Sequence, residues 1–144
     1  MSVNASKFNV EIKPTAKSRL AEMDFDNIQF GRVFSDHQLV IDFIEGKWQD
    51  AKIMQYGELP MSLAISAIHY GQAIFEGMKA QVAPDGTPLL FRPKDNLKRL
   101  NKSAERMCMQ QLPEEYFMES LKQLIRLDRG WIPTKKGSGL YIRP

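Results

Sequence analysis

The sequence has few of the residues that usually carry metal or redox chemistry. Cys108 is its one cysteine, which excludes a disulfide within the chain, and His37 and His69 are its two histidines. One thiol and two imidazoles give none of the ligand spacings of a zinc site. We therefore expect no metal. We interpret Cys108 as a buried, inert thiol on a helix and both histidines as structural or surface residues.

Long apolar runs are also lacking. No run approaches the ~20 residues that a membrane-spanning helix needs, and residues 1–17 lack the apolar segment of a secretory signal. We expect a cytoplasmic protein without a membrane partner. The net charge is +3, with 20 Lys and Arg against 17 Asp and Glu. Such a mildly basic chain is compatible with a phosphate-bearing ligand, but many proteins of this charge bind no anion.

What is present is the pattern of a globular domain. Residues 1–24 show no sustained period and are interpreted as an N-terminal arm, with a short helix over 17–23; residues 25–144 are predicted to form one domain. Residues 32–44 and 48–56 are rich in β-branched and aromatic residues on either side of a turn, which predicts a hairpin. A second hairpin is predicted over 72–91, because Pro84-Asp85-Gly86 combines a fixed φ with a residue that accepts positive φ.

Two amphipathic helices follow the hairpins. Pro93 stands where a helix tolerates proline best, and Gly130 with Pro133 indicates the end of the second helix. A final strand is predicted over 140–144. The expected apolar faces consist of Leu97, Leu100, Ala104, Met107 and Cys108 in the first helix and Phe117, Leu121, Leu124 and Ile125 in the second. Because strands and helices are segregated along the chain, the predicted fold class is α+β, an antiparallel sheet of hairpins covered by helices on one face.

Three strings of residues carry a resemblance to a known family. They are His69–Ala80, which includes Phe-Glu-Gly-Met-Lys, then residues 91–108, which begin Phe-Arg-Pro, and finally Gly137–Pro144, which ends Tyr-Ile-Arg-Pro. In this order and spacing they resemble the N-terminal part of branched-chain amino-acid aminotransferases, which are fold-type-IV enzymes that use pyridoxal 5′-phosphate. The resemblance covers residues 25–144 and less than half of a full enzyme, so we expect a small N-terminal domain, a fragment of a two-domain protein.

The resemblance assigns binding roles to three polar residues whose spacing alone does not indicate a ligand. Arg99 lies opposite the apolar face of its helix, where a solvated basic face is the simple interpretation; the family pattern implies that it holds the cofactor phosphate, which suits the fork of a guanidinium. Tyr141 and Arg143 are two apart in a strand and point to the same side. From spacing alone they are a half-buried phenol and a surface arginine, whereas the family pattern implies a receptor for the substrate carboxylate.

The resemblance also implies an apolar substrate pocket walled by Phe30, Tyr70 and Phe75, although each Phe alone is equally typical of a core. Glu76 is expected to be structural. No lysine in the chain matches the position of the Schiff-base lysine, which the resemblance places beyond Pro144. The chain is therefore expected to contain no catalytic residue and to be inactive alone.

The function implied for the parent protein is transamination of leucine, isoleucine or valine with 2-oxoglutarate, by a homodimer. Two fold-type-IV alternatives remain, a D-amino-acid transaminase and an aminodeoxychorismate lyase. From a different class, one alternative is a non-enzymatic anion- or nucleic-acid-binding module that uses the basic face of Lys98, Arg99, Lys102 and Arg106, and another is a bare dimerisation domain. Aromatic residues are not interleaved with that face, so we expect no nucleic-acid partner.

Overall fold

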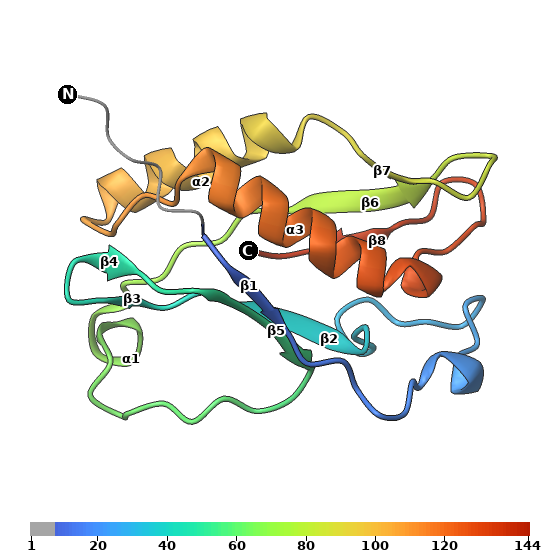
Figure 1. The fold of residues 1–144 in the computed structure, drawn as a ribbon, viewed down its shortest axis with the longest axis horizontal. Helices are drawn as coiled ribbons and strands as arrows, with labels where there is room; N and C mark the ends of the chain where they lie inside the picture. The colour runs from blue at the N-terminus through green and yellow to red at the C-terminus, as the bar shows by residue number, and fades with distance from the viewer. Residues whose placement is uncertain (1–7) are drawn as a thin grey trace.

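The structure is a computed structural model that describes residues 8–144 (Figure 1), so the first seven residues of the predicted arm lie outside the described residues. It contains two three-stranded sheets, a two-stranded ribbon and three α-helices. The strands are β1 Val10–Ile12, β2 His37–Val40, β3 Phe43–Ile44, β4 Lys47–Trp48, β5 Ala51–Gln55, β6 Met78–Val82, β7 Pro88–Leu90 and β8 Leu140–Ile142. The α-helices are α1 Ser66–Tyr70, α2 Pro93–Arg106 and α3 Glu114–Leu127. The predicted order of two hairpins, two long helices and a last strand is confirmed, although the short helix α1 lies between the hairpins, and the prediction of one sheet is wrong.

The first sheet has the order β1-β5-β2. The predicted first hairpin is present but broken: β2 pairs with β5, and the two-residue strands β3 and β4 continue it separately. Its tip, Glu45-Gly46, has positive φ at both residues, the backbone of a hairpin turn whose twist matches the strands. β1 pairs with β5 in parallel, which corrects the prediction of a wholly antiparallel sheet. The arm thus adds a strand to an edge that a hairpin alone would leave unpaired.

The second sheet has the order β7-β6-β8 and is antiparallel throughout. The predicted hairpin around Pro84-Asp85-Gly86 is confirmed, since Gly86 N–H donates to Ala83 O at 2.9 Å and β6 pairs with β7. The predicted last strand forms β8, which pairs with the opposite edge of β6. β6 is therefore the central strand, and it carries Phe75–Gly77 at its entrance.

Helices α2 and α3 cover the inner face of the second sheet (Figure 1). The core is a cluster of residues from both helices, β6 and the segment after α3: Met78, Ala80, Leu97, Leu100, Phe117, Leu121, Ile125 and Ile132. The apolar stripes are confirmed except at Leu124 of α3, which is only half-buried, and at the end of α2. The helix ends at Arg106, and Cys108 has a φ of 54° and is exposed, so the prediction of a buried Cys108 is wrong. The left-handed backbone at Cys108 ends the helix, with Cys108 N–H donating to Glu105 O at 3.1 Å and Met109 N–H donating to Ala104 O at 2.8 Å. The Asn101 side chain bonds Leu112 N–H and Leu112 O, both at 2.9 Å, and ties α2 to the segment before α3.

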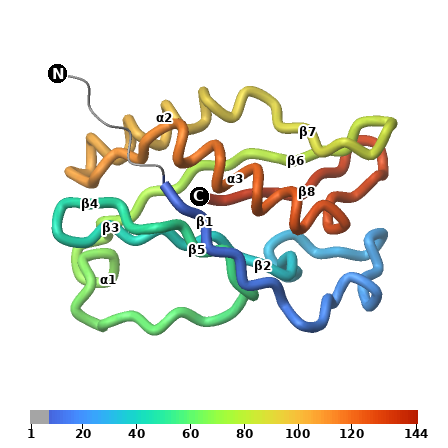
Figure 2. The backbone as a smooth tube through the Cα atoms, viewed as in Figure 1, coloured from blue at the N-terminus to red at the C-terminus, as the bar shows by residue number. Residues whose placement is uncertain are grey.

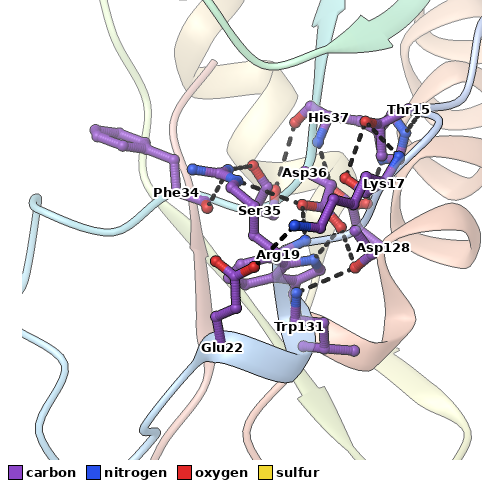
Figure 3. A network of polar contacts seen from close by, with 12 residues as sticks. Thr15, Lys17, Arg19, Glu22, Phe34, Ser35, Asp36, His37, Asp128 and Trp131 are labelled. Carbon is purple, nitrogen blue, oxygen red and sulfur yellow. Dashed lines mark hydrogen bonds and ion pairs between the residues drawn. The ribbon is translucent and has the colours of Figure 1, made fainter.

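A buried polar network joins the N-terminal segment to β2 and to the end of α3 (Figure 3). Asp36 accepts hydrogen bonds from Ser18 Oγ at 2.6 Å, Trp131 Nε1 at 3.0 Å and Arg19 N at 3.1 Å. Next to it, His37 Nδ1 lies 2.6 Å from an oxygen of Asp128. In Figure 2 the colours along the tube show that the N-terminal segment and α3 come from opposite ends of the chain. The network therefore holds β2 of the first sheet against the end of α3.

The tautomer of His37 follows from its partners. Thr15 N–H donates to Nε2 at 2.9 Å, so Nε2 carries a lone pair and Nδ1 carries the proton that is donated to Asp128. His37 N–H also donates to the other oxygen of Asp128 at 3.1 Å. These bonds agree with the interpretation of His37 as a structural residue, while His69 lies on the exposed surface of α1.

Candidate functional site

Four of the residues expected to bind substrate lie together at the end of β8. The Phe30 ring meets the Tyr141 ring edge-on with 5.2 Å between centroids. The Arg143 guanidinium lies 5.3 Å from the centroid of the Phe75 ring and 5.5 Å from that of Tyr141. These separations are within the range of cation–π attraction. The side chains of Tyr141 and Arg143 thus share a side, as the strand period predicts, and form an aromatic–guanidinium cluster with Phe30 and Phe75.

The ring of Tyr141 lies against Gly77. The register pairs Tyr141 with Lys79 across β6 and β8, so Gly77 stands diagonally opposite on the same face. A Cβ atom at Gly77 would lie 2.5 Å from the Tyr141 hydroxyl oxygen and 3.1 Å from Cε2. The absence of a side chain at Gly77 is therefore what leaves room for the phenol.

Arg99 is held by Glu76. Arg99 Nε donates to Glu76 Oε2 at 3.0 Å and Arg99 Nη2 donates to Oε1 at 2.6 Å, a two-point pair of a guanidinium with a carboxylate. Glu76 Oε1 also accepts from Gly77 N–H at 2.8 Å and from Asn96 Nδ2 at 3.2 Å. Glu76 is 8% exposed, while the side chain of Arg99 remains 65% exposed. The buried carboxylate thus fixes one edge of an exposed cation.

The electrostatics of the pair follow from these contacts. Hydrogen bonds from Arg99 lower the pKa of Glu76; burial opposes them, and the bonds from Gly77 N–H and Asn96 add to the lowering, which brings the pKa to about 2. The bond to Glu76 in turn raises the pKa of Arg99 above its ordinary value. Both groups therefore stay charged across the physiological range.

A surface hollow of about 540 Å³ adjoins this pair. Arg99 lines it together with Arg92 and Lys79, while Asp95 supplies one negative charge. Arg92 is itself turned by a left-handed φ of 49°, and its Nε lies 2.6 Å from Asp95 Oδ2. Two of the five N–H groups of the Arg99 guanidinium face Glu76, which leaves its other edge to the hollow. An anion with two or three acceptor oxygens suits such a lining.

Tyr70 is not part of the cluster. It ends α1, is 85% exposed, and makes no aromatic or cation–π contact with residues 8–144. Figure 1 shows α1 near the β3–β4 ribbon, away from β8. The other members of the basic face, Lys98, Lys102 and Arg106, are exposed. Arg99 differs from them by its bond to a buried carboxylate, a contact that the helical spacing of the sequence did not predict.

Within the described part of the chain, no three His, Cys, Asp or Glu side chains come together in a group able to hold a metal ion. Over the same residues, each helix is too short or too polar to cross a bilayer. What the geometry does define is one guanidinium, that of Arg99, bonded to a buried carboxylate beside a hollow, and a second, that of Arg143, within cation–π distance of two aromatic rings.

Comparison with known proteins finds relatives that are much longer than this chain. No protein-family model matches the chain. It is 46% identical over 136 residues to branched-chain-amino-acid aminotransferase 2 of Bacillus subtilis (strain 168), which covers 94% of the chain and 37% of that protein. It is 48% identical over 122 residues to branched-chain-amino-acid transaminase 1 of the same organism, covering 84% of the chain and 34% of the relative.

A third relative, the branched-chain-amino-acid aminotransferase of Mycolicibacterium smegmatis (strain ATCC 700084 / mc(2)155), is 40% identical over 131 residues, which are 90% of the chain and 36% of that protein. These relatives are aminotransferases by name. More particularly, the chain is similar over 84–94% of its length to proteins named branched-chain aminotransferases. It spans about a third of the length of the curated relatives it matches.

Proposed function

We propose that this chain is the N-terminal part of a cytoplasmic, homodimeric branched-chain aminotransferase. The complete enzyme transfers the amino group of leucine, isoleucine or valine to 2-oxoglutarate and uses pyridoxal 5′-phosphate. The observation that supports this most is the convergence of Phe30, Phe75, Tyr141 and Arg143 beside the Glu76–Arg99 pair, in a chain whose relatives bear this name.

The residues present suit the phosphate end of that cofactor. Arg99 keeps N–H groups free of Glu76 and lines the hollow with Arg92 and Lys79, and a phosphate dianion matches both this charge and the planar fork of donors. The cofactor, when bound, supplies the electron-withdrawing ring that makes amino transfer feasible. The residues of this chain hold the cofactor phosphate and orient the cofactor. We propose no proton-transferring residue within residues 1–144.

At the substrate end, we propose that Arg143 and the Tyr141 hydroxyl bind a substrate carboxylate. Phe30 and Phe75 then form the apolar wall that receives the branched side chain, and Tyr70 belongs to the same pocket in the complete enzyme. A wall of this kind separates leucine from valine weakly, by about 1–3 kcal/mol per methylene. The three branched-chain substrates are therefore expected to share the site.

The test is a substrate panel on a longer polypeptide that carries this sequence and the remainder of the relatives' length. With 2-oxoglutarate as acceptor, leucine, isoleucine and valine are expected to react, and D-alanine is not. The 144-residue chain assayed alone is expected to show no turnover, because in this proposal the Schiff-base lysine belongs to the remainder of the enzyme. Preference for D-alanine would contradict the proposal, as would turnover of leucine by the short chain.

A further inference from the structure

We propose that the dipeptide Glu76-Gly77 positions the two anion-contacting groups of the site: Glu76 orients the guanidinium of Arg99, and Gly77 leaves the space that the ring of Tyr141 occupies. This inference rests on the proposed function, in which Arg99 holds a phosphate and Tyr141 helps to bind a carboxylate. Neither Glu76 nor Gly77 touches a reacting atom; each acts through another side chain.

Glu76 can hold Arg99 in one orientation because the carboxylate is itself buried and hydrogen-bonded. Its Oε1 accepts hydrogen bonds from Gly77 N–H and Asn96 Nδ2 in addition to Arg99 Nη2. Asn96 Nδ2 also donates to Gly77 O at 3.1 Å, which ties α2 to the same dipeptide. With Nε and Nη2 directed inward, the Nη1 edge of Arg99 is left for a ligand. An unheld arginine would lose more conformational freedom on binding the same anion.

Gly77 acts on Tyr141 through space rather than through a bond. A methyl group there would stand 2.5 Å from the hydroxyl oxygen, well inside contact distance, and 3.2 Å from Cζ. The phenol must therefore move if Gly77 acquires a side chain. Glu76 N–H also donates to Pro144 O at 3.0 Å, so the dipeptide is joined to the end of the strand segment that carries Tyr141 and Arg143. One short segment thus sets the spacing between the two anion subsites.

The Gly77 half of the inference is tested by Gly77→Ala, with Gly57→Ala as the matched control because a Cβ at Gly57 meets nothing within 4 Å. In the 144-residue chain, Gly77→Ala is expected to shift the NMR signals of the Tyr141 ring, and Gly57→Ala is not. In the longer, active polypeptide, Gly77→Ala is expected to raise KM for 2-oxoglutarate at least about tenfold, with kcat changed less than about threefold.

A rescue by Tyr141→Phe separates positioning from general damage. Phenylalanine lacks the hydroxyl oxygen, which is the atom nearest the added methyl. In a Tyr141→Phe background, Gly77→Ala is therefore expected to raise KM less than about threefold further. An equal further rise in both backgrounds would overturn the Gly77 half, as would unmoved Tyr141 ring signals.

The Glu76 half is tested by Glu76→Gln. In the 144-residue chain, the Arg99 Nε–H signal, assigned through Arg99→Lys, is expected to lose its protection from exchange. The Kd for inorganic phosphate is expected to rise at least about fivefold, although a negative charge has been removed. Tighter phosphate binding, or an unchanged Arg99 signal, would overturn this half, because charge rather than orientation would then govern the site.

The readouts keep this inference apart from the proposed function. If the Tyr141 and Arg99 signals move as expected while the wild-type protein binds neither phosphate nor 2-oxoglutarate, the positioning geometry is supported and the proposed function fails. If the wild-type protein transaminates but the signals do not move, the proposed function stands and the positioning inference is wrong.

Discussion

Replacing Asp36 with asparagine should destabilise the protein strongly, because Asp36 is 5% exposed and surrounded by donors. Its Oδ2 accepts from Ser18 and Trp131, and its Oδ1 accepts from the backbone of Arg19. An asparagine has one acceptor oxygen and one NH₂ group, so in either orientation the NH₂ faces donors. A buried donor left without an acceptor costs about 1–3 kcal/mol, and a hydrogen bond to a charged group contributes about 1.5–3 kcal/mol. We expect Asp36→Asn to lower the free energy of unfolding by about 2–4 kcal/mol.

The assay is urea unfolding followed by tryptophan fluorescence, since Trp131 belongs to the network. Asp26→Asn is the matched control: Asp26 pairs with Lys135 at 2.9 Å, but its side chain is 76% exposed. A surface pair of this kind contributes about 0–1 kcal/mol. Equal losses for the two variants would refute the reasoning, because burial and donor count would then not decide the effect.

The difference in free energy of unfolding between wild type and Asp36→Asn should depend on pH in a definite direction. Burial raises the pKa of Asp36, but the bonds from Ser18, Arg19 and Trp131 together outweigh burial, so the pKa lies below its ordinary value. A lowered pKa in the folded state means that the carboxylate stabilises the fold above the unfolded-state pKa of about 3.9 and loses this effect as the pH falls. The difference in free energy of unfolding between wild type and Asp36→Asn should therefore become smaller below that pH. A gap that stays constant down to pH ~3 would contradict the account.

Three further predictions concern single residues. Ser120 Oγ is buried without a hydrogen-bond partner in residues 8–144, so Ser120→Ala should raise the free energy of unfolding by about 1 kcal/mol, and a lower urea midpoint would contradict this. The pKa of Glu76 falls from 4.5 to about 2 on folding, so Glu76→Gln should destabilise the chain at pH 7, and the difference should disappear as the pH falls from 4.5 to about 2. Cys108 is exposed, and its thiol should react with a disulfide reagent in the folded chain within about threefold of the rate in urea; protection on folding would show that it is covered.

Local patterns in the sequence were sufficient for the second half of the chain. The turn residues Pro84-Asp85-Gly86 and the apolar stripe of α3 each encode their element within a few neighbours, and both form as predicted. The apolar pattern of α2 extended to Cys108, but the helix stops two residues earlier, because Cys108 adopts a left-handed backbone and Met109 N–H donates to Ala104 O. An apolar period does not report such a cap, because the residue at the left-handed position is not a glycine.

What the sequence did not predict depends on long-range contacts. The pairing of β1 with β5 joins residues about 40 apart, and a three-residue strand has no period of its own. The Asp36–Trp131 bond spans 95 residues and the Arg99–Glu76 pair spans 23. At the site, strand alternation was enough to predict that Tyr141 and Arg143 point to the same side. The pairing of Glu76 with Arg99 could not be predicted in this way, because only the structure shows the carboxylate buried against the guanidinium.

The measurement that tests the account most directly is a titration of pyridoxal 5′-phosphate, followed by its absorbance, into the longer polypeptide with Arg99→Gln or Arg106→Gln. Both substitutions remove one positive charge from the same helix, but only Arg99 is held by a buried carboxylate beside the hollow. We expect Arg99→Gln to weaken binding at least about tenfold and Arg106→Gln to leave it unchanged. Equal losses for both variants would show that the whole basic face attracts the anion, and would contradict a specific phosphate site at Arg99.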